Sequence, residues 1–174
     1  MDTVFADERQ INTDICPTPL RFLVKTGADH VGFFDVPDRF LDVPEGRGDF
    51  LPQRQDVYEA GITLYGPAPQ DIIRPVPWSL LVESLDFLFP YIVSHFKNSV
   101  LMLCRIAYTW AHREMCSKKQ AGEWALEAFG DPWAPMIRTA LDQYAAGQPQ
   151  SGIPQDTLKA FEQHCAGYIG KLRM

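Results

Sequence analysis

The stretch from Arg105 to Glu123 holds the polar side chains whose types and spacing are best suited to chemistry. Arg105 and His112 stand seven positions apart, and Lys119 and Glu123 stand four apart. On a helix, both spacings place the two side chains on one face. An arginine on an otherwise apolar helix needs a carboxylate or carbonyl partner, and a lysine four positions from a glutamate is typical of a solvated ion pair. The pattern predicts a polar face on neighbouring helices.

Cysteine spacing argues against a metal site. The four cysteines lie far apart and form no C-x-x-C motif; they are Cys16, Cys104, Cys116 and Cys165. Together with His112 they do not reproduce the ligand spacing of a zinc site. The sequence predicts free thiols in a reducing cytoplasm and no bound metal.

Composition excludes several classes of protein. Hydrophobic residues make up 46% and charged residues 22% of the 174 residues, which is an ordinary soluble globular balance. The net charge of −6 argues against a general nucleic-acid binder, which usually presents a basic face. The acidic N-terminus does not resemble a signal peptide, and polar residues interrupt the longest apolar run, near residues 80–93.

The first part of the chain reads as mixed α and β. Residues 19–25 and 30–35 are rich in β-forming side chains and are separated by a turn, which predicts a hairpin. Residues 53–60 predict a short helix that ends at Gly61, and residues 62–65 predict a strand.

From Val76 onward the pattern is helical. Helices are expected after Pro77, after Asn98, from Ser117 to Phe129, and over residues 135–146 and 155–172. Gly130 and Gly147 are expected to end the helices that precede them.

Residues 97–129, read with Tyr65-Gly66-Pro67 upstream and Asp142-Gln143-Tyr144 downstream, resemble the helical C-terminal half of streptomycin/spectinomycin adenylyltransferases. The ordered series of segments carries this resemblance, since no single short motif is specific. It implies that 62–67 is the end of a nucleotidyltransferase domain and that a helical domain follows. A complete enzyme of this family would bind ATP and magnesium and transfer AMP to a drug hydroxyl.

The chain departs from the family pattern at several functional positions. It contains no Gly-Ser turn and no Asp-x-Asp pair, which in the family hold nucleotide phosphates and metal. Arg21 stands at the position of the catalytic glutamate, and an arginine cannot accept a proton at neutral pH. Of two acidic positions that suit a cationic drug, Lys119 replaces the first and Glu123 keeps the second; Leu141 and Asp142 stand where the family has a phosphate-binding basic residue.

An alternative comes from a second resemblance. The Arg-x6-His pattern of Arg105 and His112 is similar to that of small helical ribonucleases of the HEPN type. There the arginine steadies the phosphate and the histidine is the acid or base. This reading makes Arg105 and His112 the catalytic residues of a ribonuclease or of a nucleotidyltransferase-partner protein.

The expected fold class is α+β: a small β-rich remnant of a nucleotidyltransferase sheet over residues 1–70, followed by an all-α helical bundle over residues 76–174. The expected function is that of an incomplete relative of aminoglycoside O-adenylyltransferases, a binding or interaction module without autonomous nucleotidyl transfer. Glu123, Lys119 and Arg105 are the expected substrate-binding residues, and no residue is assigned to catalysis or to a metal.

The expected cofactors follow from the resemblance: none for this chain alone, and ATP and magnesium for the complete enzyme. The expected partner is a small cationic molecule or a second protein chain that covers the incomplete sheet. No membrane association is expected, nucleic acid is not an expected ligand, and the expected location is the cytoplasm.

Overall fold

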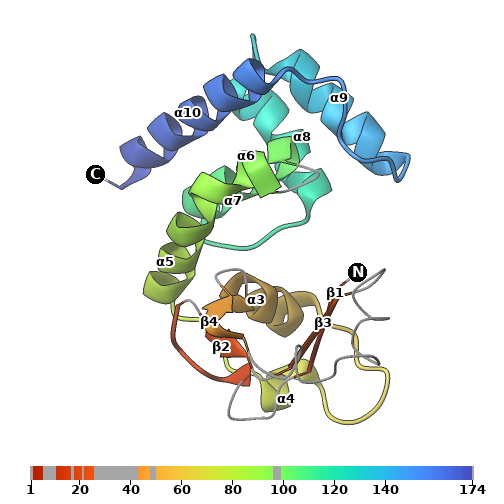
Figure 1. The fold of residues 1–174 in the computed structure, drawn as a ribbon, viewed down its shortest axis with the longest axis vertical. Coiled ribbons are helices and arrows are strands. Elements are labelled where there is room, and N and C mark those ends of the chain that lie inside the picture. The colour runs from red at the N-terminus through yellow and green to blue at the C-terminus, as the bar shows by residue number, and fades with distance from the viewer. Residues whose placement is uncertain are drawn as a thin grey trace. The chain divides into compact units, whose positions relative to one another are not determined.

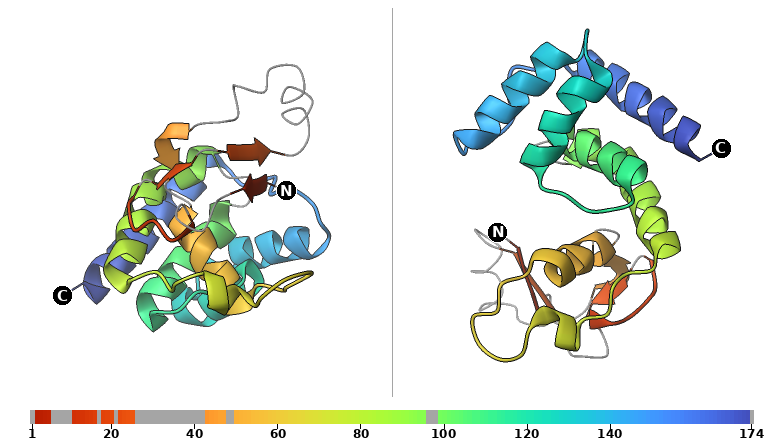
Figure 2. Two further views of the ribbon diagram at one scale, coloured as in Figure 1. Left: turned by 90° about the horizontal axis from the view of Figure 1, so that it is seen from below. Right: turned by 180° about the vertical axis from the view of Figure 1, so that it is seen from behind.

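A computed structural model describes residues 2–5, 11–16, 18–20, 22–25, 43–47, 50–95 and 99–173. The chain divides into two compact units, Met1–Phe87 and Leu88–Met174. The expected division into residues 1–70 and 76–174 stays a prediction. Figures 1 and 2 show the elements of each unit.

In its described residues, the first unit combines short strands with helices. Its elements are β1 (Asp2–Phe5), β2 (Thr18–Leu20), β3 (Phe22–Lys25), β4 (Val43–Arg47), α3 (Phe50–Ala60), α4 (Pro69–Ile72) and α5 (Trp78–Leu88), at whose end the division falls. β1 pairs with β3 and β2 pairs with β4, both antiparallel, as two separate two-stranded pairs.

The expected α+β class with a β-rich remnant is wrong, because the described part of the chain is mainly helical. Its strands are three to five residues long and do not join into one sheet. Residues 62–65, expected to be a strand, form a loop whose apolar side chains are exposed. Their pattern suits a strand, but in the described structure no neighbouring strand pairs with them. The expected strand at 30–35 lies outside the described residues.

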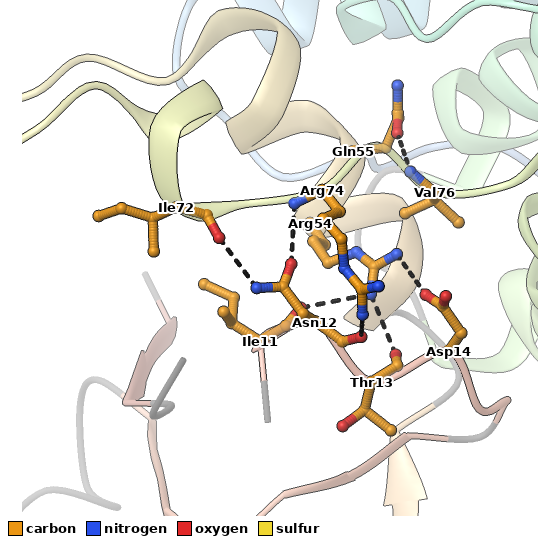
Figure 3. Close-up of polar contacts among 9 residues, drawn as sticks. All are labelled: Ile11, Asn12, Thr13, Asp14, Arg54, Gln55, Ile72, Arg74 and Val76. Carbon is orange, nitrogen blue, oxygen red and sulfur yellow. Dashed lines mark hydrogen bonds and ion pairs between the residues drawn. The ribbon is translucent and has the colours of Figure 1, made fainter. Parts of the chain in front are cut away.

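A buried arginine on α3 organises the first unit (Figure 3). Arg54 is fully buried, and its Nη2 lies 2.7 Å from Asp14 Oδ1. Its Nη1 donates to the carbonyl oxygens of Ile11 at 3.3 Å and Thr13 at 3.0 Å. A buried guanidinium requires such partners, since desolvation penalises an uncompensated charge. The charge therefore ties segment 11–14 to α3.

Segment 11–14 and helix α3 also hold the chain between α4 and α5. Asn12 Nδ2 donates to the Ile72 carbonyl at 2.9 Å, and its Oδ1 accepts from the Arg74 backbone N–H at 2.8 Å. Gln55 Oε1 accepts from the Val76 backbone N–H at 2.7 Å (Figure 3). These bonds satisfy the backbone of an irregular connection.

The second unit is helical. Its elements are η2 (Phe89–Tyr91), α6 (Ile92–His95), α7 (Ser99–His112), α8 (Lys118–Phe129), α9 (Ala134–Ala145) and α10 (Gln155–Leu172). The predicted helices after Pro77 and Asn98, and those near 117–129, 135–146 and 155–172, are confirmed as α5, α7, α8, α9 and α10. Gly130 and Gly147, the expected stops, have positive φ angles of 58° and 68°.

Helix α7 is the centre of this unit, because its apolar positions extend almost around it. It packs against α6, α8, α9 and α10. Val100, Leu103, Cys104 and Ala107 are fully buried along it. Gln150 caps its beginning by accepting from the Val100 N–H at 2.9 Å. In the described part of the chain, no helix is both long enough and apolar enough to cross a membrane.

Gly122 permits the close contact of α8 with α7 and α9. A Cβ at this position would lie 2.7 Å from Leu141 Cδ2 and 2.9 Å from Leu101 Cδ2. Real Cβ atoms do not approach other atoms so closely, so an added side chain would require the Leu141 and Leu101 side chains to shift within a packed interior.

We expect Asp14→Asn to lower the free energy of unfolding by roughly 2–3 kcal/mol, because the buried Arg54 charge loses its carboxylate but keeps two carbonyl partners. The matched control is Glu123→Gln, which breaks an exposed ion pair and should cost less than about 0.5 kcal/mol. Scanning calorimetry compares the two variants. Equal losses would show that the Asp14–Arg54 ion pair stabilises the fold no more than an exposed pair does.

We expect Gly122→Ala to be about 1–3 kcal/mol less stable than Gly170→Ala, measured by urea unfolding. Both sites are helical, so both variants receive the same gain in helix propensity. Gly170 has open space around it, so the difference isolates the cost of overpacking. Equal stability of the two variants would contradict the close packing of α8.

Candidate functional site

The candidate site lies in the second unit, where α7 ends and α8 begins. Arg113 follows α7 in the left-handed region, at a φ angle of 58°. A non-glycine residue rarely adopts this conformation, which costs on the order of 1 kcal/mol. The reversal sends residues 114–117 back along α7.

Arg105 joins α7 to this returning segment. Its Nε donates to the Cys116 carbonyl oxygen at 2.6 Å, and its side chain is half-buried. The expectation that Arg105 finds a carbonyl or carboxylate partner is confirmed. The bond keeps a positive charge beside the segment that leads into α8.

Helix α8 begins immediately after this contact, with a reciprocal cap. Ser117 Oγ accepts from the Gln120 N–H at 3.1 Å, and Gln120 Oε1 accepts from the Ser117 N–H at 3.1 Å. Lys118 is therefore the first residue of the helix. The remaining N–H groups of this first turn form the positive end of the helix dipole.

Lys118 brings a second cation to the same place. Its side chain is half-buried, and its Nζ lies 5.9 Å from the centroid of the Tyr144 ring on α9. Burial first, and then the charge of Arg105, lower the pKa of the Lys118 ammonium. No carboxylate pairs with Lys118 within the described ranges. Two cations and a helix N-terminus meet here, an arrangement suited to an anion.

Lys119 and Glu123 are arranged differently. Lys119 Nζ lies 3.3 Å from Glu123 Oε1, and both side chains are exposed. Such a pair is screened by solvent and contributes little to stability. The pair leaves no net charge at these two positions.

His112 belongs to an aromatic cluster rather than to the cationic group. Its ring centroid lies 4.3 Å from that of Tyr108 and 5.7 Å from that of Trp124. Tyr108 Oη donates to Glu114 Oε1 at 2.6 Å, and this hydrogen bond raises the pKa of Tyr108 to about 12. The contacts of Arg105 and His112 thus lead to different groups, and the catalytic role of this pair stays a prediction.

The thiols and the acidic residues form no metal centre in the described ranges. Cys104 and Cys165 are buried, Cys16 and Cys116 are half-buried, and all four are free. Burial raises the pKa of the Cys104 thiol, which makes it unreactive. No group of three or more histidine, cysteine, aspartate or glutamate side chains gathers among the described residues.

Sequence reasoning found Arg105 but missed Lys118 and Tyr144. The four-residue spacing of Lys119 and Glu123 pointed to Lys119 instead of its neighbour Lys118. The available signal was the cap: with Ser117 as N-cap, Lys118 is the residue nearest to the helix terminus. Its contact with Tyr144 depends on how α9 packs, which spacing along the chain does not reveal.

Comparisons with known proteins agree on one family. Residues 71–167 match the model of the aminoglycoside adenylyltransferase C-terminal domain. An aminoglycoside (3'') (9) adenylyltransferase from Klebsiella pneumoniae is 28% identical over 120 residues, and one from Escherichia coli is 30% identical over 122 residues. Each alignment covers 66% of this chain and 46% of the relative. The chain thus spans less than half the length of these relatives.

Two further proteins extend the comparison. A spectinomycin 9-adenylyltransferase from Campylobacter jejuni is 28% identical over 87 residues, covering 48% of this chain and 34% of that protein. The fold is similar to a crystal structure of a spectinomycin adenyltransferase from Enterococcus faecialis with ATP and spectinomycin. The TM-score is 0.71 at 13% identity, and the match covers 99% of this chain and 68% of that one.

Proposed function

Because the chain belongs to the aminoglycoside adenylyltransferase family through its C-terminal domain, we propose that its second unit is a nucleotide-binding module. Arg105 and Lys118 hold the phosphates of ATP at the beginning of α8. The relatives are adenylyltransferases by name, and one was solved with ATP. The carrying observation is that Arg105 binds the Cys116 carbonyl two residues before Lys118, the first residue of the capped helix α8.

Charge supports a phosphate chain as the ligand. Two neighbouring cations repel each other: burial first, and then the charge of Arg105, lower the pKa of Lys118. A polyphosphate relieves it, because several anionic oxygens can meet the guanidinium, the ammonium and the helix N–H groups together. The chain as a whole carries a net charge of −6, so this local positive group is what would select an anion.

The site for a cationic drug has less support in the structure than the site for phosphates. Glu123 is the acidic residue that the family pattern provides for a cationic drug, and it remains the proposed contact. Its pairing with Lys119 weakens its attraction for a cation, because the lysine competes for the same carboxylate. Lys119 would have to move aside for Glu123 to act.

We propose that this 174-residue chain by itself does not transfer AMP. It contains neither the Gly-Ser turn nor the Asp-x-Asp pair. The carboxylates of such a pair hold the metal that bridges the nucleotide phosphates in this class of chemistry. Arg21, which stands at the position of the family base and lies outside the described residues, cannot accept a proton at neutral pH. The chain is proposed to act in the cytoplasm as a binding module of a system that confers aminoglycoside resistance.

We expect Lys118→Gln to weaken ATP binding ten-fold or more, since a charge-assisted hydrogen bond is worth about 1.5–3 kcal/mol. Lys119→Gln, its matched neighbour, should bind ATP within about two-fold of the parent chain. Calorimetric titration with ATP, tripolyphosphate and adenosine measures this, and tripolyphosphate should bind whereas adenosine should not. Equal losses in the two lysine variants would contradict the assignment to Lys118.

We expect no transfer of AMP to streptomycin or spectinomycin when the chain is incubated with ATP and magnesium. Mass spectrometry of the drug after an overnight reaction measures this, with the complete Escherichia coli relative as the positive control. A drug product heavier by one AMP would overturn the proposal that the chain lacks autonomous transfer.

A further inference from the structure

Helix α10 meets the end of α8, and the turn over residues 130–133 that follows it, through a group of aromatic rings. The ring centroid of Phe161 lies 5.9 Å from that of Phe129 and 5.3 Å from that of Trp133. His164, about one turn further along α10, reaches the same two rings at 4.9 Å and 5.3 Å. We call these four residues the α10 seam. One of its four rings, the imidazole, can carry a charge.

The imidazole of His164 is placed where a proton is unfavourable. The residue is half-buried, but its Nε2 is buried and has no hydrogen-bond partner among the described residues. In an imidazolium ion both ring nitrogens are donors, so the charged form carries an N–H at Nε2 whichever tautomer it came from. A buried donor without an acceptor costs free energy, and a charge increases that cost. The seam therefore favours the neutral ring.

The nearest charge acts in the same direction. Lys171 follows His164 by seven residues on α10, about two turns, and its positive charge repels a second cation. Burial first, and then this lysine, lower the pKa of His164 below its usual value of 6.5.

No carboxylate compensates for a proton on this ring. Within the described part of the chain, His164 forms no ion pair. The elements packed against it carry three carboxylates near the seam: Glu127 on α8, Asp131 in the turn and Glu162 on α10. The thiol of Cys165 and the phenol of Tyr168, also on α10, supply no negative charge below about pH 7.

We propose that the α10 seam is an acid-sensitive contact, in which the neutral His164 ring packs α10 against the end of α8 and the turn over residues 130–133, and a proton on this ring loosens that packing. Phe129 and Trp133 then lose one of their ring partners on α10. Helix α10 also packs against α7, so the loosening is local. The seam lies at the end of α8 and the proposed phosphate site at its beginning, so the inference does not depend on ATP binding.

The direction of the pH effect follows from burial of the ring. The pKa of His164 is lower in the folded chain than in the unfolded chain, so between the two values the unfolded chain binds more protons. The stability that the neutral ring contributes is fully present above about pH 6.5. It is lost as the pH falls from there to the pKa of the folded state, so acid loosens the seam.

Proton NMR of the full chain from about pH 8 to about pH 5 measures the charge on the ring. We expect the His164 ring resonance to titrate with a midpoint below 6.5, its usual pKa. The Trp133 ring resonances should change with the same midpoint, because the two rings are in contact. A His164 midpoint at or above this value would overturn the proposal. It would show instead that the neighbouring rings stabilise the imidazolium by cation–π attraction.

Two variants identify the His164 resonance. It should be absent from His164→Phe, and Lys171→Gln should move its midpoint upward by removing the repelling charge. Lys171 is exposed, so Lys171→Gln should remain folded and keeps the titration interpretable even where His164→Phe folds poorly.

Urea unfolding at about pH 7.5 and about pH 5.5 measures the effect on packing. The unfolding equilibrium constant should rise between these pH values by about three-fold or more beyond the rise in His164→Phe, which keeps an aromatic ring but cannot be protonated. The matched control is His112→Phe, at an exposed histidine that contacts other rings, and it should behave like the parent chain. Equal pH dependence in the parent and in His164→Phe would overturn the proposal, as would a loss of the pH dependence in His112→Phe alone.

Discussion

The hydrogen bond from Arg105 to the Cys116 carbonyl is the contact on which the site of the second unit depends. It binds the returning chain to α7 and so determines where α8 begins. The Ser117 cap then starts the helix at once, which leaves Lys118 beside Arg105. Two cations are thus held together by backbone geometry in spite of their repulsion. Such a local cost is typical of a binding site, where stability is given up for function.

The close packing of α8 supports this arrangement from the other side. Gly122 lets α8 approach Leu101 on α7 and Leu141 on α9. Tyr144 lies three residues beyond Leu141 on α9, about one helical turn away, and its ring meets the Lys118 side chain. Gly122, which has no side chain, therefore helps to position the charged side chain of Lys118. Trp124, near the middle of the same helix, packs its ring against that of His112 in the aromatic cluster.

The sequence predicted the helices well, because their signals are local. The Ser117 cap and the stops at Gly130 and Gly147 act through neighbouring residues, and the structure has α8 and α9 where they indicate. The prediction of a strand at residues 62–65 was wrong, because β-forming residues become a strand only when another strand pairs with them. Lys118 was missed for a related reason: its contact with the Tyr144 ring joins residues that are distant in sequence. Arg54 was also missed, since nothing in its local pattern predicts burial beside Asp14.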